Sequence, residues 1–279
     1  MSDPAPAPPP GADADDLRNS YAGRLLRRPL VATGGVLLVA GTFVWVGLGA
    51  GAVFGAIAAL VMLAIVLFVV NRIASRRAER EFFTAYAAAR GLVLVESADR
   101  VPPATPLLRQ GNRRFARDVL TGSLPGGVAG TLALYTYVEE HGEQSSEHRF
   151  TVAICELPQL APFVDRLYCE RRRGFRFLDS AEDAFRADNQ RIELESDEVD
   201  RRYEVFAGSH EDPVRVRRVF EPTFLVWLAE RAPEDFAFEL EAGTLCCNVG
   251  GQNKSSSALD ELCAAAATVV KRLTDEAAG

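Results

Sequence analysis

The pattern of hydrophobic and polar positions changes abruptly after residue 28. Residues 29–71 contain no Asp, Glu, Lys, Arg or His, a run of 43 uncharged positions. As a helix this run would extend about 65 Å, roughly twice the hydrocarbon thickness of a bilayer. Gly47, Gly49 and Gly51 divide it into residues 30–48 and 52–70, each long enough for one span. The pattern therefore predicts two transmembrane helices joined by a tight turn.

Arginines flank this apolar run on both sides. The arginines nearest to it are Arg24, Arg27 and Arg28 on one side and Arg72, Arg76, Arg77 and Arg80 on the other. Cationic flanks stay on the cytoplasmic side of a membrane. We therefore expect a multi-pass protein of the cell (inner) membrane with both termini in the cytoplasm.

The glycines of the run allow two interpretations. Gly47, Gly51 and Gly55 recur at four-residue spacing, which lets a partner helix approach closely in lipid and predicts possible self-association. The same glycines follow an apolar segment, as in a dinucleotide-binding loop. No acidic residue stands near twenty positions further on to bind a ribose, so the membrane interpretation is favoured.

Composition shifts divide the chain into four regions. Residues 1–29 are a Pro- and Asp-rich tail with a basic flank, which we expect to be disordered and cytoplasmic. Residues 30–71 hold the two transmembrane helices. Residues 72–91 continue the second span as a stalk helix, with Gly91 placed as its C-terminal cap. Residues 92–279 form a cytoplasmic domain.

Period-two alternation predicts strands in this domain. The predicted strands are residues 116–120, 132–138, 150–155, 190–195, 202–207, 236–240 and 245–249. Turns are expected at Gly126-Gly127 and Ala242-Gly243, and residues 139–148 are predicted to be a polar loop.

Helices are predicted at three places after these strands begin. Asp212 and Pro213 start one, Pro222 starts a second, and a third carries apolar residues at helical spacing over 259–273 after the serines at 255–257. The predicted fold class is α+β, a two-helix transmembrane hairpin followed by a soluble antiparallel-sheet domain packed with helices.

Composition excludes some functions. Of 279 residues 48% are hydrophobic and 25% charged, and the net charge is -7. The first 71 residues contain four basic and four acidic residues, so the rest of the chain carries the whole negative charge. A basic nucleic-acid-binding domain is therefore not expected. The five cysteines lack CxxC spacing, which signals neither a disulfide framework nor a zinc ribbon.

Several short motifs follow one another in a familiar order. They are Arg117-Asp118-Val119-Leu120-Thr121-Gly122, Tyr135-Thr136-Tyr137, a strand over 152–158 ending in Leu-Pro, Glu221-Pro222 before Trp227-Leu228, and the segment 238–245. In this order the chain resembles the small membrane-anchored proteins of unknown function of GC-rich actinobacteria, over residues 82–273. That family has no established activity, so the resemblance implies no site residue.

Histidines offer the most obvious candidate chemistry. His141 and His148 stand among four glutamates, Glu139, Glu140, Glu143 and Glu147, which together could offer metal ligands. Their spacing matches no recognised metal-binding pattern, and a solvated loop explains the charges. His210 lies in a turn before a helix, where capping accounts for its neighbours.

Other reactive residues have structural explanations. Cys246 and Cys247 would point to opposite faces of a strand and are expected to be small buried hydrophobes. Ser123 lacks the glycine that precedes a nucleophile elbow. The run Glu170-Arg171-Arg172-Arg173 could touch anionic headgroups but is predicted to be a solvated turn. The sequence thus assigns no catalytic, cofactor-binding or metal-ligating residue.

Two classes of function remain after these exclusions. The favoured one is a membrane-tethered cytoplasmic protein-interaction or scaffold module, with the lipid bilayer and an unidentified membrane or cytoplasmic protein as partners and no nucleic acid. The alternative is an enzyme whose site is assembled from distant polar residues. A deep polar pocket with perturbed titratable groups would favour the enzyme, and an exposed apolar patch would favour the module.

Overall fold

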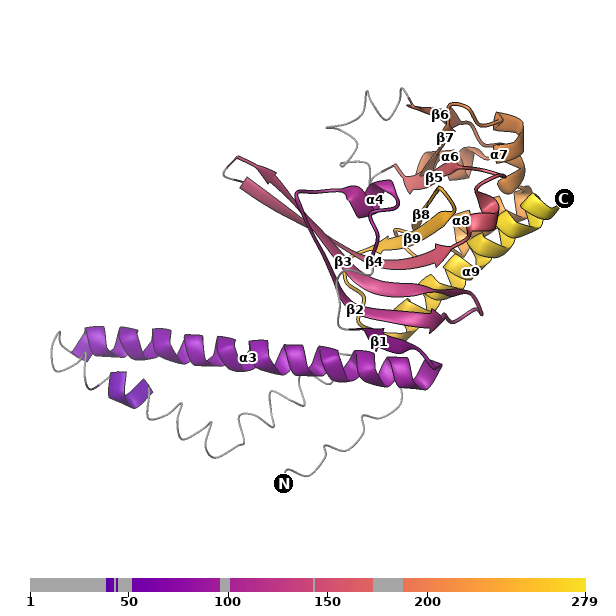
Figure 1. Ribbon diagram of the computed structural model, residues 1–279. Helices are drawn as coiled ribbons and strands as arrows, with labels where there is room; N and C mark the ends of the chain where they lie inside the picture. Colours follow the sequence, from indigo (N-terminus) through magenta and orange to yellow (C-terminus); the bar gives the residue numbers. More distant parts are fainter. Residues whose placement is uncertain (1–38, 43, 45–51, 96–100, 143, 173–187) are drawn as a thin grey trace. The chain divides into compact units, whose positions relative to one another are not determined.

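The computed structural model describes residues 39–42, 44, 52–95, 101–142, 144–172 and 188–279 (Figure 1). The chain divides into two compact units, one ending at Tyr86 and including residues 254–256, and one formed by 87–253 and 257–279. Most of the first predicted span lies outside the described residues; residues 39–42 and 44 of it are helical. The predicted tail at 1–29 lies outside them altogether.

Helix α3 (Ala52–Arg90) is the long element of the first unit. By length and composition, the part of the helix over residues 56–90 contains an apolar stretch long enough to cross a membrane. Large hydrophobic side chains are exposed along its first half, including Phe54, Leu60 and Phe68. The helix continues without interruption through the predicted stalk, which confirms that the second apolar segment and the stalk are one helix.

The end of α3 is capped as predicted. Gly91 adopts a φ of 68°, a left-handed conformation that glycine enters without steric cost. The backbone N–H of Leu92 then donates to the carbonyl of Ala87 at 2.9 Å, which satisfies an acceptor that the helix leaves open. Arg90 forms an ion pair with Asp260, so the last turn of the helix is fastened within the second unit.

The second unit is built on a nine-stranded antiparallel sheet with strand order β1-β2-β3-β4-β9-β8-β5-β7-β6. The strands are β1 (Val93–Val95), β2 (Arg113–Ser123), β3 (Ala129–His141), β4 (Gln144–Glu156), β5 (Arg166–Arg171), β6 (Asn189–Ile192), β7 (Tyr203–Gly208), β8 (Ala237–Glu241) and β9 (Thr244–Gly250). Every predicted strand is present, and the coarse α+β class is confirmed. β1 and β5 were not predicted as strands.

The prediction of a polar loop at residues 139–148 is wrong. Its residues extend the β3–β4 hairpin, with Glu139 paired to Ser146 and His141 paired to Gln144 around Gly142. We call residues 139–148 the hairpin arm, because they extend past the strand pairing of β2, which ends at Val138 (Figure 1). Polar residues on both faces hide the period-two pattern here, while backbone hydrogen bonds still form the ladder.

Helices cover the sheet unequally. α9 (Ser256–Ala278), α7 (Pro213–Val219) and α8 (Pro222–Glu230) lie together on one side, and the short α4 (Pro106–Arg109) lies on the other (Figure 1). α6 (Asp197–Arg202) follows β6. The predicted start signals are confirmed, since Asp212 accepts a hydrogen bond from the N–H of Val214 and Pro222 begins α8.

Two apolar layers result from this arrangement. The α9 side contains the aromatic residues Phe236 and Phe238 of the β8 region, both fully buried. The α4 side contains Leu107 and Leu108, which pack with Tyr135 and other residues of β3, β4 and β9. The second layer also holds the charged residues from which a site could be built.

Candidate functional site

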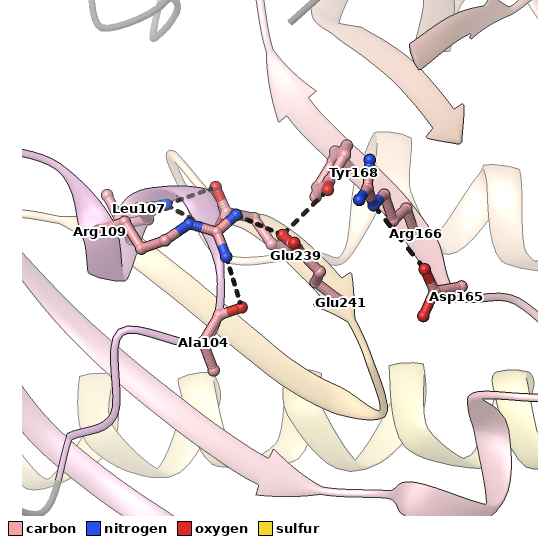
Figure 2. Close-up of polar contacts among 8 residues, drawn as sticks. All are labelled: Ala104, Leu107, Arg109, Asp165, Arg166, Tyr168, Glu239 and Glu241. Atoms are coloured by element: carbon pink, nitrogen blue, oxygen red, sulfur yellow. Dashed lines mark hydrogen bonds and ion pairs between the residues drawn. The ribbon is translucent and has the colours of Figure 1, made fainter. Parts of the chain in front are cut away.

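Acidic side chains gather on the sheet face that α4 covers. Tyr168 of β5 lies opposite Glu239 of β8, and Arg166 lies opposite Glu241. Because strand side chains alternate between faces, these four side chains and that of Glu170 belong to the same face. Figure 2 shows the contacts of Glu239 and Glu241 with Leu107 and Arg109 of α4.

Glu239 binds the beginning of α4. The backbone N–H of Leu107 donates to both carboxylate oxygens of Glu239, at 2.9 and 3.2 Å (Figure 2). The first N–H groups of a helix have no partner within the helix, and the residue at the cap position, Thr105, makes no side-chain capping bond. Glu239 therefore supplies the cap from a strand that is 132 residues away in the sequence.

Glu170 is the second buried acid. Its exposed fraction is 7% and that of Glu239 is 0%, and their carboxyl groups are hydrogen-bonded to each other. Burial raises the pKa of both groups, and the adjacent Glu239 charge raises the pKa of Glu170 further. Hydrogen bonds from Glu170 and Leu107 lower the pKa of Glu239 against this trend. The Leu107 N–H therefore favours the charged form of Glu239, and burial beside that carboxylate favours the protonated form of Glu170.

Glu241 makes the outer connection. Its Oε2 accepts hydrogen bonds from Arg109 at 2.6 Å and from the Tyr168 hydroxyl at 3.1 Å (Figure 2). Arg109 also donates to the carbonyl of Ala104 at 3.2 Å, which ties the end of α4 to the segment before it. Burial and the Glu241 carboxylate raise the pKa of Tyr168, so its hydroxyl remains a donor.

A third connection fixes the middle of α4. The hydroxyl of Tyr135, on β3, donates to the carbonyl of Leu108 at 3.1 Å. Leu107 and Leu108 are each 1% exposed, so this short helix is anchored by apolar burial as well as by hydrogen bonds. The polar network thus fastens α4 to three strands. Glu170 and Glu239 are buried, whereas Glu241 is partly exposed, and this geometry suits a structural joint better than contact with a substrate.

The predicted candidates are not brought together. His148 lies on β4, where its ring stacks on Tyr137 at 4.7 Å and its Nε2 is 3.6 Å from Glu139. His210 follows β7 and lies 3.5 Å from Glu211. Glu143 is outside the described residues. Within the described part of the chain, no group of three or more His, Cys, Asp and Glu could hold a metal ion.

The cysteines are structural. All five are buried, and burial raises the pKa of Cys155 to about 11, which keeps its thiol protonated. Cys246 lies opposite Glu239 on the α4 side, whereas Cys247 lies opposite Phe238. The expectation that this pair points to opposite faces is confirmed. Ser123 ends β2 and is exposed.

The prediction of a solvated turn at Glu170-Arg171-Arg172-Arg173 is wrong. Glu170 and Arg171 end strand β5, and the N–H of Arg172 donates to the carbonyl of Arg202 at 3.0 Å. The guanidinium of Arg171 lies over the Tyr203 ring, 5.5 Å from its centroid. Arg173 is outside the described residues. The charged residues conceal a strand whose alternate positions are the apolar Leu167 and Cys169.

Comparisons with known proteins find a solved structure whose backbone is distantly similar to this chain. No family model and no curated protein matches the chain. One similar solved structure is described as the crystal structure of the mycobacterial trehalose monomycolate transport factor A, TtfA. The identity is 11%, the TM-score is 0.46, and the match covers 72% of this chain and 94% of that one. A likeness at this level carries no argument about function. The actinobacterial resemblance stays a prediction.

Proposed function

We propose that this protein is a two-pass membrane protein whose cytoplasmic domain binds a partner protein at the inner membrane face. The observation that carries the proposal is the continuity of α3. Its first 20 residues, 52–71, are uncharged and would extend about 30 Å, the thickness of the hydrocarbon core. The same helix then ends in the cap and ion pair at Arg90. A domain attached in this way stays close to the bilayer.

The topology has a direct test. A compartment-sensitive reporter fused at the C-terminus should report the cytoplasm, and one fused at Gly49 should report the opposite side. Arginines before the first apolar segment and after the second support this orientation. A C-terminal reporter on the far side of the membrane would overturn the two-pass proposal.

The hairpin arm is the surface that we assign to the partner. Its sequence contains four glutamates and no Lys or Arg, and Ser145 and Ser146 at its end are exposed. Glu140 forms an ion pair with Arg113 at 3.0 Å, and Glu147 forms one with Arg149 at 3.1 Å. Exposed ion pairs of this kind contribute little stability, so the glutamates can exchange these partners for a basic protein surface.

Tethering makes a weak contact productive. Two proteins held on one membrane meet at a higher effective concentration than two proteins in solution. Self-association through Gly47, Gly51 and Gly55 is a further proposal of the same kind; Gly47 and Gly51 lie outside the described residues. The close approach that small residues allow would place two copies of the domain together.

Site-directed photocrosslinking tests the arm. A photoreactive residue in place of Ser145 should give one discrete adduct in native membranes. Excess salt should reduce the yield of this adduct. The matched control places the same group at Glu230, which is exposed at the end of α8. Equal adducts at both positions would show that the arm is not a specific surface.

An acid–base enzyme is the second candidate function. The raised pKa values of Glu170 and Glu239 favour it, because catalytic acids are tuned in this way. Their burial favours the interaction module, since a substrate must reach the acid. Glu170→Gln separates the two: loss of a cellular activity in a fully folded protein would support the enzyme.

A further inference from the structure

Arginines begin where the apolar part of α3 ends. Arg72 directly follows the 20 uncharged residues, and Arg76, Arg77 and Arg80 follow within about 12 Å along the helix axis. The headgroup region of a bilayer adds about 5 to 8 Å on each side of the hydrocarbon core. If residues 52–71 fill the hydrocarbon core, the first arginines lie at the level of the lipid phosphates.

The arginines occupy one side of the helix. At about 100° per residue, Arg72, Arg76 and Arg80 lie within roughly 80° of one another, and Arg77 lies about 60° further round. All four are exposed. Ala74 and Ala78, which lie on the opposite side, are fully buried. The positive charge is therefore one-sided and directed away from the packed face of the helix.

The acidic residues of this segment are fewer than its arginines, since residues 72–81 contain four arginines and two glutamates. Glu79 forms an ion pair with Lys254. Glu81 is half-buried and lies about 40° round the helix from Arg77 and about 140° from Arg76. Guanidinium groups carry several donors in a planar arrangement that matches phosphate oxygens, and they remain charged at any physiological pH.

We propose that Arg72, Arg76 and Arg77 form a binding site for the headgroups of anionic phospholipids, extended by Arg80. The proposal rests on the proposed function, because it requires residues 52–71 to cross the bilayer. Each basic residue near an anionic surface favours binding by about fivefold. Because the site covers one side of the helix, the attraction tilts α3 toward that side and fixes its rotation in the membrane.

The full chain reconstituted into vesicles of phosphatidylcholine and phosphatidylglycerol tests the proposal. Spin-labelled phosphatidylglycerol should be retained at the protein about fivefold or more over spin-labelled phosphatidylcholine. The preference should fall steeply in 1 M salt, where the Debye length is about 3 Å. Arg72→Gln combined with Arg76→Gln and Arg77→Gln should abolish it, and the corresponding lysine replacements should keep most of it.

The control variant removes three arginines elsewhere. Arg201→Gln, Arg217→Gln and Arg218→Gln change exposed residues of α6 and α7 and should leave the lipid preference unchanged. If the wild-type protein resists carbonate extraction but retains both lipids equally, the proposed headgroup site is overturned. An acidic protein would then be the better candidate for a ligand of these arginines. Removal of the wild type from vesicles by carbonate would overturn the membrane span itself. Resistance of the glutamine variant to carbonate shows that its effect is not a failure to insert.

Discussion

Glu170 and Glu239 bring two buried carboxyl groups together on neighbouring strands of one sheet face. Two ionised carboxylates in contact and removed from water would repel each other strongly, so one of them must remain neutral. The N–H of Leu107 donates to Glu239 and favours its charged form, and the carboxylate beside Glu170 raises the pKa of Glu170. The pair thereby connects β5, β8 and α4 through one hydrogen-bonded joint.

Stability should depend on pH through this pair. The pKa of Glu170 is raised well above its ordinary value of 4.5, so the folded state holds a proton that the unfolded state releases. The resulting stabilisation is complete below that ordinary value and declines as pH rises toward the raised pKa. The limiting slope for one proton is about 1.4 kcal/mol per pH unit. Urea unfolding of the detergent-solubilised chain between pH 5 and 8 measures it.

Glu170→Gln should remove this dependence. The amide donates to Glu239 as the protonated acid does, and it cannot ionise. We expect the variant to be nearly as stable as the wild type at pH 5 and more stable at pH 8. Glu230→Gln, an exposed control on α8, should keep the wild-type slope. An unchanged slope in Glu170→Gln would mean that the pair holds no shared proton.

Loss of the Glu239 carboxylate should release α4. Glu239→Ala leaves the buried N–H of Leu107 without its acceptor, which costs about 1 to 3 kcal/mol. Glu239→Gln retains an acceptor oxygen and should cost less. Hydrogen exchange should accelerate at Leu107 and Leu108 in the alanine variant while the amides of α9 remain protected. Uniform acceleration in both helices would indicate global destabilisation in place of local release.

The site escaped sequence analysis because its parts are far apart. In Phe238-Glu239-Leu240-Glu241 the apolar residues mark a strand, and the glutamates between them look like its solvent side. What buries Glu239 is a helix that begins at Pro106, and no local period reports a contact across 132 residues. In the sequence, the only local indication of this short buried helix is Pro106 followed by Leu107 and Leu108.

Strands were predictable where apolar residues fill the faces of the sheet. In β3, β4, β8 and β9 the central residues of both faces are buried, and turn glycines mark the hairpins. The hairpin arm has no buried face, so its ladder depends on backbone pairing that leaves no side-chain period. In β5, arginines and glutamate outnumber Leu167 and Cys169, and the charges hide a strand at the centre of the site.

Replacement of His148 tests the arm as a structural element. Its ring is partly buried and stacks on Tyr137, so His148→Ala should lower the free energy of unfolding by about 0.5 to 1.5 kcal/mol. His210→Ala, whose side chain is 62% exposed, should change stability by less than about 0.5 kcal/mol. Thermal unfolding of the two variants side by side gives the difference. Equal losses would show that stacking in the arm contributes nothing.

Substitutions in the aromatic cluster that packs against α8 should affect stability more at a buried residue than at a half-buried one. Phe238 is 0% exposed and lies between Phe220, Phe224 and Phe236, with ring centroids 6.3 to 6.4 Å from its own. Phe238→Ala should cost about 3 to 5 kcal/mol, because the ring leaves a cavity that its neighbours cannot fill.

Trp227 should be less costly to remove. It stacks on Phe224 at 5.3 Å and contacts the edge of Phe236 at 5.7 Å, but its side chain is only half-buried. Trp227→Ala therefore opens a space that water can enter, and we expect a loss of about 2 kcal/mol in urea unfolding. If this loss equalled that of Phe238→Ala, the outer face of α8 would have to be covered in the folded protein, for instance by a partner or by a second copy of the chain.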